Sequence, residues 1–300
     1  MTTTRGRWRP RHVQYVPAVD LDVLRRADAG PADGLLVDLE DGVLASMKDT
    51  ARAACREFLA DAGASSRCMV RVNEAGSPWA DADLVAVADR ATRLLVPKIH
   101  GPEDVVALSA RLDELERDAG RPTGSIEVLP ILETAAAVLA ASDLARASER
   151  VVGLVLGQAD LTVDLGCSGL GDDGFVPSPM LDHALAWTVY AAVAAGLPCY
   201  VSPWVREGDP EGRERELRRV LDLGFTGIVV YDAEGVAAVE SARRPTPGQL
   251  RFAREAVEAR ADAAAHGRGA TKHRGWTIEG SYGDIVDALL RREEEAGRDA

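Results

Sequence analysis

IEVLPILET (126–134) and VVGLVLGQAD (151–160) are two apolar runs, each with an acidic residue at or next to its last position. Both runs are short, rich in branched aliphatic side chains and followed by a helical or turn pattern. Nearly continuous apolar runs of this length are typical of parallel strands that are buried on both faces. The two stretches therefore predict successive strands of an α/β fold, with Glu133 and Asp160 at their C-terminal ends.

Six further apolar runs complete the pattern, and most of them precede a helical stretch rich in Ala, Arg and Glu. They are VQYVPAV (13–19), GLLVDLED (34–41), CMVRVNE (68–74), RLLVPKI (93–99), LPCYVSPW (197–204) and GIVVYD (227–232). Eight β/α repeats indicate a TIM (β/α)8 barrel. A doubly wound open sheet is the alternative, but that fold usually has a glycine-rich first turn, which YVPAVDLD (15–22) does not offer.

The pattern changes after residue 243. A turn-rich break (243–249) is followed by one long helix (250–267), an irregular stretch (268–282) and a last amphipathic helix (283–297). We therefore expect three segments: a flexible basic arm (1–12), the barrel (13–243) and a helical tail (244–300). The tail packs either on its own barrel or on a neighbouring subunit.

Composition and charge narrow the class of protein. A hydrophobic content of 46% with only 5% aromatic residues is typical of an α/β enzyme rich in Ala, Val and Leu. The net charge of −13 argues against non-specific binding to nucleic acid or to anionic membranes. The four cysteines form no C-x-x-C pair, and neither a secretory signal nor a membrane-length apolar run is present. We expect a soluble, cytoplasmic protein with reduced thiols and without a nucleic-acid or membrane partner.

The acidic residues at the strand ends indicate a metal site. In a barrel of this kind the C-terminal ends of the strands converge on one face, which holds the active site. Glu133 and Asp160 would meet there and supply the oxygen ligands that magnesium prefers. The alternative interpretation is that each carboxylate only caps the helix that follows it.

Two earlier strand ends carry acids and an arginine, in LLVDLEDGV (35–43) and VRVN (70–73). Strand alternation places Asp38 and Glu40 on one side, where their charges need a metal or basic partners. The planar fork of Arg71 is suited to bind a substrate carboxylate through two oxygens. The structural alternatives are a turn with a helix cap for the acids, and an ion pair with those acids for the arginine.

Two other strand ends carry candidate residues. Lys98 could form a Schiff base, but nearby acids would keep it protonated, which favours a charge-balancing role. In GQADLTVDLG (157–166) the backbone can approach a ligand at Gly157, and the N–H groups of Gly157, Gln158 and Ala159 can hold a carboxylate. The sequence has no G-x-S-x-G, Walker A or H-E-x-x-H motif.

Together, the order and spacing of these segments resemble the citrate lyase beta-subunit-like branch of the HpcH/HpaI aldolase superfamily, relatives of the malyl-CoA and citramalyl-CoA lyases. The matching segments are YVP (15–17), LLVDLEDGV (35–43), KDTAR (48–52), VRVN (70–73), LLVPKI (94–99), LPILET (129–134), GQADLTVDLG (157–166), AAVAAGLP (191–198) and DLGFTG (222–227).

The resemblance implies a TIM barrel, a trimer or a hexamer of trimers, and magnesium held by Glu133 and Asp160. It also implies that Arg71 grips a carboxylated substrate. Family members cleave or form carbon–carbon bonds of 3-hydroxyacyl thioesters such as malyl-, citramalyl- or citryl-CoA, and some hydrolyse the thioester instead. A tail aspartate of the family reaches the neighbouring subunit's site, and GSYGD (280–284) offers Asp284 as its counterpart.

The chain departs from the family pattern where coenzyme A would lie. VPAVD (16–20) stands in place of a P-G-N segment, and VVYDAEG (229–235) in place of I-H-P-x-Q. At the end of the seventh strand, where the family usually has an acidic residue, this chain has VSPWVREGD (201–209). These differences predict that magnesium and oxo-acid chemistry are kept, while another carrier or a free acid replaces coenzyme A.

The sequence thus predicts a magnesium-dependent carbon–carbon lyase or aldolase that acts on a 2-oxo acid or a 3-hydroxy acid, free or as a thioester. Glu133 and Asp160 bind the metal, and Arg71 binds the substrate carboxylate. Asp38 and Glu40 order metal waters or Arg71, and the tail residue Asp284 is an acid–base group for a neighbouring chain. The alternatives are a magnesium-dependent thioester hydrolase of the same family and a ligand-binding descendant with altered catalysis.

Overall fold

The chain divides into two compact units, Met1–Val239 and Glu240–Ala300. The computed structural model describes residues 8–172, 174–203, 206 and 208–298. The division between the units falls inside helix α11 (Ala233–Arg243), whereas the sequence predicts a boundary after residue 243.

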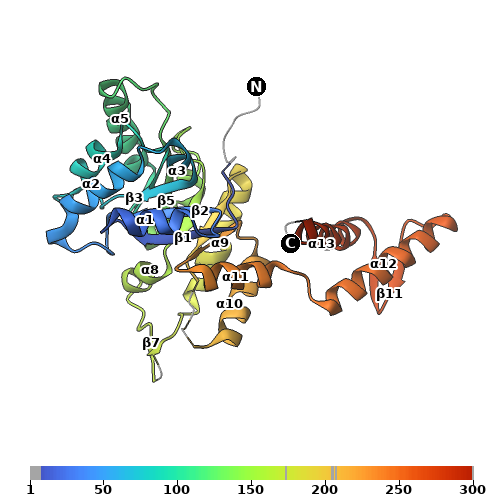
Figure 1. The fold of residues 1–300 in the computed structure, drawn as a ribbon. Helices are drawn as coiled ribbons and strands as arrows, with labels where there is room; N and C mark the ends of the chain where they lie inside the picture. Colours follow the sequence, from blue (N-terminus) through green and yellow to red (C-terminus); the bar gives the residue numbers. More distant parts are fainter. Residues whose placement is uncertain (1–7, 173, 204–205, 207, 299–300) are drawn as a thin grey trace. The chain divides into compact units, whose positions relative to one another are not determined.

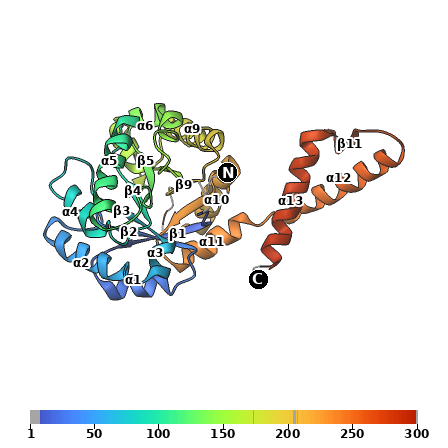
Figure 2. The same ribbon diagram turned by 90° about the horizontal axis from the view of Figure 1, so that it is seen from above.

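A closed barrel of parallel strands forms the centre of the first unit (Figures 1 and 2). Its strands are β1 (His12–Pro17), β2 (Gly34–Asp38), β3 (Cys68–Arg71), β4 (Arg93–Val96), β5 (Glu127–Leu132), β6 (Leu154–Leu156), β9 (Cys199–Val201) and β10 (Gly227–Val230). Around the barrel they follow the order β1-β10-β9-β6-β5-β4-β3-β2. All eight predicted strands are confirmed, and the fold is the predicted TIM (β/α)8 barrel.

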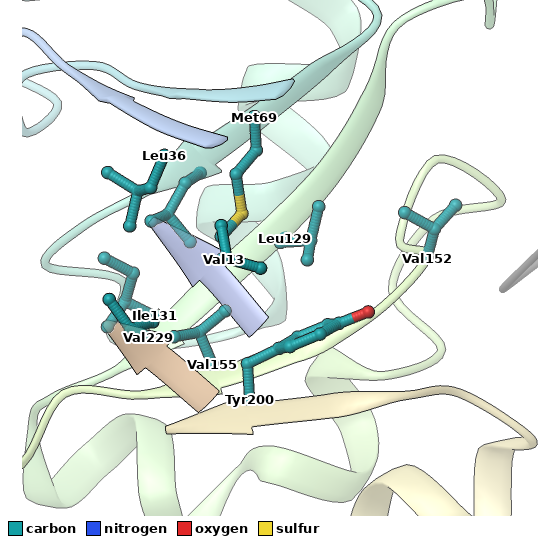
Figure 3. Packing of buried hydrophobic residues seen from close by; sticks show 10 residues of the cluster. Val13, Leu36, Met69, Leu129, Ile131, Val152, Val155, Tyr200 and Val229 are labelled. Atoms are coloured by element: carbon teal, nitrogen blue, oxygen red, sulfur yellow. The ribbon is translucent and has the colours of Figure 1, made fainter. Parts of the chain in front are cut away.

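Side chains that come mostly from the strands fill the barrel. Figure 3 shows the cluster at its centre, which consists of Val13, Leu36, Met69, Leu95, Leu129, Ile131, Val152, Val155, Tyr200 and Val229. None of these side chains is more than 6% exposed. The apolar runs of the sequence therefore form the core, and the polar residues that follow each run are left at the strand ends.

Helices surround the barrel on its outside (Figure 2). Besides α11 they are α1 (Leu21–Asp28), η1 (Ala45–Met47), α2 (Lys48–Phe58), α3 (Ala62–Arg67), α4 (Ala80–Val87), α5 (Pro102–Asp118), α6 (Ala135–Leu139), α7 (Ala141–Leu144), α8 (Gln158–Asp164), α9 (Met180–Ala195) and α10 (Pro210–Leu223). Sequence signals set the limits of α10. Asp209 caps its N-terminus by accepting a hydrogen bond from the Gly212 N–H at 2.8 Å, and Gly224 ends the helix with φ = 108°.

A small hairpin, β7 (Leu170–Gly171) with β8 (Gly174–Phe175), follows α8. The sequence does not predict it, because strands of two residues give no periodic signal. The side chains of Leu170 and Phe175 are exposed, and β8 borders the cavity at the barrel mouth.

The second unit consists of α12 (Pro247–Ala265), β11 (Thr271–His273), β12 (Trp276–Ile278) and α13 (Gly280–Arg298). Ala253, Ala256, Ile278 and Val286 form a small core of its own. The two predicted tail helices are therefore confirmed.

The prediction that 268–282 is irregular is wrong, because β11 and β12 pair as an antiparallel hairpin. The turn between them contains Arg274 at φ = 46° and Gly275 at φ = 86°. Positive φ at both central positions is the geometry of a type I′ turn, which matches the twist of a two-residue hairpin.

The predicted basic arm falls mostly outside the described residues. Within them, Trp8 packs against Tyr200 with ring centroids 5.8 Å apart, and the Tyr200 hydroxyl donates to the Trp8 carbonyl at 3.0 Å. No helix in the described part of the chain is long and apolar enough to cross a membrane.

Candidate active site

The C-terminal ends of the barrel strands surround a cavity of about 860 Å³. Its lining includes Arg71 at the end of β3, Glu133 just after β5, and residues 157–160 at the start of α8. The structure therefore brings the predicted carboxylate-binding, metal-binding and loop residues to one cavity.

Arg71 is held by the two acids at the end of β2. Its Nε donates to Asp38 Oδ1 at 2.6 Å, and its Nη1 lies 3.0 Å from Glu40 Oε2. The parallel register of β2 and β3, which sets Asp38 opposite Arg71, brings the first pair together. The ion pair and the predicted carboxylate clamp are compatible, since Arg71 also lines the cavity.

Asp38 is fully buried, and several donors surround it. The Tyr15 hydroxyl donates to its Oδ2 at 2.8 Å, and the backbone N–H groups of Glu40 and Gly42 donate to its two oxygens at 2.9 and 2.8 Å. Burial alone would raise the pKa of Asp38, but the hydrogen bond and charge of Arg71 oppose it, and the pKa is lowered. Asp38 therefore stays ionised and orients Arg71.

Glu40 differs from Asp38 in the direction of its pKa shift. Burial raises the pKa of Glu40 to about 8, although Arg71 acts in the opposite direction. The negative charges of Asp41 and Glu133 raise it as well. The charge state of Glu40 therefore depends on a nearby cation.

Lys98 links the two predicted metal ligands. Its backbone N–H donates to Glu133 Oε1 at 2.6 Å, its Nζ lies 3.7 Å from the same oxygen, and Nζ also forms an ion pair with Asp160. Burial lowers the pKa of Lys98, but the hydrogen bond to Asp160 and the charge of Glu133 raise it overall. A protonated lysine suits charge balance, whereas a Schiff base requires a neutral amine.

The oxygen donors around Lys98 suit magnesium. Glu133 and Asp160 both lie within ion-pair distance of one ammonium group, so their oxygens converge on a position where a cation is stable. Magnesium keeps several waters and is usually bound by one or two carboxylates. In the described part of the chain, no three or more His, Cys, Asp and Glu side chains are placed so that they could hold a metal ion by themselves. These residues therefore fit a magnesium ion whose shell is completed by water and substrate.

Gly157 is required by close packing against Glu133. A Cβ atom at position 157 would lie 2.7 Å from Glu133 Oε2 and 2.9 Å from Ile131 Cγ2. The next residue, Gln158, begins α8, and its Nε2 donates to the Ser202 carbonyl at 2.9 Å. Together with Ala159 these residues line the cavity, where the sequence predicts substrate binding.

Other cavity residues are missing from the set predicted from the sequence: Tyr15, Ser202, Tyr231, Phe175 and Arg206. Ser202 directly follows β9 and Tyr231 directly follows β10, so their positions at strand ends are a signal that the sequence contains. Phe175 belongs to the β7–β8 hairpin, for which there is no such signal.

Asp284 belongs to the second unit. It lies in α13 and, with Arg260 and Arg268, borders a smaller cavity of about 290 Å³. Its role as an acid–base group for a neighbouring chain stays a prediction.

A closed (β/α)8 barrel that gathers carboxylates, an arginine and a protonated lysine at its strand ends is a barrel enzyme suited to an anionic substrate. Residues 11–233 match HpcH/HpaI aldolase/citrate lyase. The chain belongs to this family and is an enzyme of its lyase superfamily.

Individual relatives cover nearly the whole chain. Citrate lyase subunit beta of Escherichia coli (strain K12) is 28% identical over 289 residues, which are 96% of this chain and 94% of the relative. A (3S)-malyl-CoA thioesterase of Cereibacter sphaeroides is 30% identical over 273 residues, which are 90% and 89% of the two chains. Among solved structures, CitE from Mycobacterium tuberculosis in complex with magnesium, acetoacetate and coenzyme A matches with a TM-score of 0.78 and 28% identity over 97% of this chain and 99% of that chain. The family predicted from the sequence is confirmed.

Proposed function

We propose that the protein is a magnesium-dependent carbon–carbon lyase or aldolase that acts on a 2-oxo acid or a 3-hydroxy acid. The observation that carries this proposal is that Glu133 and Asp160 both pair with the Lys98 ammonium and line the same cavity as Arg71. Further support comes from the related CitE structure, which contains magnesium with acetoacetate and coenzyme A.

Five charged residues near the strand ends have definite roles in this proposal. Glu133 and Asp160 hold the magnesium ion, which when bound polarises the oxygen on the reacting carbon. Arg71 binds the substrate carboxylate, and Asp38 fixes the guanidinium at the cavity wall. Lys98 stays protonated and balances the charge of the two carboxylates.

Hydrolysis of a thioester at the same site is the second candidate function. It is favoured by the relative named (3S)-malyl-CoA thioesterase, which is 30% identical. The products distinguish the two reactions, because a lyase yields two carbon fragments and a hydrolase yields the intact acid and a thiol. A ligand-binding descendant without catalysis would yield neither.

We also propose, from the family resemblance, that the protein is a cytoplasmic homotrimer or a multiple of one. The proposed substrate is a small carboxylic acid, either free or as a thioester of coenzyme A or of a carrier. In such an assembly the tail would pack on the barrel or on a neighbour, and Asp284 would supply an acid–base group in trans.

Thermal shift with magnesium and small oxo acids tests the proposal, since a bound ligand raises the Tm by mass action. Pyruvate, glyoxylate and oxaloacetate should each raise the Tm of the wild-type protein when magnesium is present. Glu133→Gln should lose this magnesium-dependent shift, measured from its own unliganded Tm. Glu57→Gln is the control, because its side chain is 64% exposed on α2.

A full shift in Glu133→Gln would contradict the assignment of the metal site. Addition of acetyl-CoA to the same samples decides which carrier is used. A further rise in Tm would mean that coenzyme A is bound despite the altered segments, and no further rise would favour a free acid or another carrier.

A further inference from the structure

Two hydroxyl groups at the barrel mouth have no role in the site described so far. Ser202 directly follows β9, Tyr231 directly follows β10, and both line the cavity. Their Oγ and OH atoms are 3.2 Å apart. In the closed strand order β10 lies opposite β4, so this pair stands across the mouth from the strand that leads to Lys98.

The two tyrosines of the cavity differ in what their hydroxyl groups contact. The rings of Tyr15 and Tyr231 meet edge to face, with centroids 5.7 Å apart. The Tyr15 hydroxyl donates to Asp38 at 2.8 Å, and the Tyr15 ring lies 5.6 Å from the Arg71 guanidinium carbon. Tyr15 therefore belongs to the Arg71 cluster. Tyr231, whose side chain is 58% exposed, borders the open part of the cavity.

The hydroxyl pair keeps a hydrogen-bond donor for a ligand. A serine or tyrosine hydroxyl supplies one O–H donor and can also accept. Within the pair one O–H is directed to the other oxygen, and no other described residue accepts a hydrogen bond from either group. One O–H therefore remains, and a ligand oxygen could accept it without breaking a bond inside the protein.

The cavity has room for a substrate with two oxygen-bearing ends. Its volume of about 860 Å³ far exceeds what a three-carbon or four-carbon acid fills, and it lies at the upper end of the range for ligand pockets. Apolar side chains, among them Leu36, Ile131 and Val229, also line it. An acid bound at Arg71 would thus leave space that extends along an apolar wall to the hydroxyl pair.

We propose that Tyr231 and Ser202 bind the second carbonyl of the substrate, namely the acyl oxygen that gains charge when the carbon–carbon bond breaks. This inference rests on the proposed lyase function. The substrate hydroxyl loses its proton to a carboxylate base and becomes the carbonyl of the oxo acid. The electrons of the broken bond form the enolate of the acyl fragment, which then takes a proton at carbon from the protonated base. A donor fixed at the enolate oxygen stabilises the transition state for this step.

The matched acids (S)-lactate and (S)-malate test the proposal by binding alone. Both present a carboxylate with an adjacent hydroxyl, and malate adds a second carboxylate whose oxygens stand in for the acyl oxygen. In calorimetric titrations with magnesium, the wild-type protein should prefer malate. The double variant Tyr231→Phe/Ser202→Ala should reduce the malate-to-lactate affinity ratio about tenfold, because neither hydroxyl is left to donate a hydrogen bond to the second carboxylate. Its affinity for lactate should change less than about twofold.

Two further variants make the test specific. Tyr15→Phe removes a hydroxyl that serves Asp38, so it should weaken both acids together and leave their ratio unchanged. Arg206→Gln examines the other group at the cavity that could hold a second carboxylate. The inference is overturned if the wild-type protein shows no preference, if the double variant keeps it, or if only Arg206→Gln removes it. If the wild-type protein binds neither acid with magnesium, the proposed function fails and the inference fails with it.

Discussion

At the scale of single residues, Arg71 meets several requirements at once. Its Nε holds Asp38 at 2.6 Å, its Nη1 lies 3.0 Å from Glu40, and the side chain lines the cavity. A lysine would keep the charge, but one ammonium group cannot replace the planar fork at all of these positions. We expect Arg71→Lys to weaken magnesium-dependent binding of pyruvate at least about tenfold, measured by titration calorimetry.

The matched control for this variant is Arg111→Lys. Arg111 lies on the surface of α5, away from the cavity. It forms ion pairs with Asp81 of α4 and with Glu114 of α5. Its replacement should leave the affinity for pyruvate unchanged. Wild-type affinity in Arg71→Lys would mean that Arg71 serves only as an ion-pair partner of the acids.

The sequence predicts which residues gather at the site better than it predicts their partners. Arg71 and Glu133 follow apolar runs, and the ends of parallel strands converge, so their presence in one cavity can be expected from the pattern. That Lys98 joins Glu133 to Asp160 depends on side-chain rotamers and on a backbone with φ = 52° at Lys98, which no sequence pattern specifies. Tyr231 could also be expected at the site, because it lies near the C-terminal end of the predicted strand 227–232.

At the scale of elements, the length of the apolar run decides what the sequence can predict. The eight barrel strands stand out because most of their residues are apolar and buried, on both faces of the sheet. The two hairpins, β7–β8 and β11–β12, have strands of only two or three residues, which are too short for periodicity to be visible. Local turn geometry and packing within each unit form them instead.

The turn of the β11–β12 hairpin gives a prediction at this scale. Gly275 has φ = 86°, and a Cβ atom there would meet nothing within 4 Å. A side chain at this position would therefore cause no clash, and it would destabilise the turn only through backbone strain. We expect Gly275→Ala to reduce the local stability of the hairpin by about 1 kcal/mol. Hydrogen exchange of the β11 and β12 amides measures this change.

Gly269→Ala is the control for the hairpin. A Cβ atom at Gly269 is equally unobstructed, but the residue is not in the left-handed region. Its exchange rates should match those of the wild-type protein. If the β11 and β12 amides were equally protected in Gly275→Ala and Gly269→Ala, the turn would tolerate a side chain at Gly275, and the positive φ of this residue would not restrict it to glycine.

At the scale of the whole molecule, one buried ion pair joins separate parts of the barrel unit. Glu116 of α5 is fully buried and accepts hydrogen bonds from both Nη atoms of Arg150 at 2.9 and 2.6 Å. It also accepts from the backbone N–H groups of Gly124 and Ile126, both at 2.7 Å. Because these residues lie in α5, in the segment before β5 and in the segment before β6, the carboxylate ties three parts of the chain together.

Because of this carboxylate, the free energy of unfolding should decrease at low pH. Burial alone would raise the pKa of Glu116, but the hydrogen bonds from Arg150 and the backbone outweigh it and lower the pKa from 4.5 to about 2. Below pH 4.5 the carboxylate of Glu116 becomes protonated in the unfolded chain, whereas in the folded protein it stays ionised down to about pH 2. The contribution of Glu116 is therefore full above that pH and is lost as the pH falls toward 2. The shift corresponds to about 3 kcal/mol.

We expect Glu116→Gln to lower the free energy of unfolding by about 3 kcal/mol at pH 7, since Arg150 loses a charged partner. Urea titrations at pH 7 and pH 4 measure how this loss depends on pH. At pH 4 the difference from the wild-type protein should be smaller by about 1 kcal/mol, because part of the wild-type contribution has gone. Glu114→Gln, on the same helix but 56% exposed, should change little at either pH. An equal loss at both values of pH would mean that Glu116 acts through its shape and hydrogen bonds, and that its charge adds nothing to the stability of the barrel.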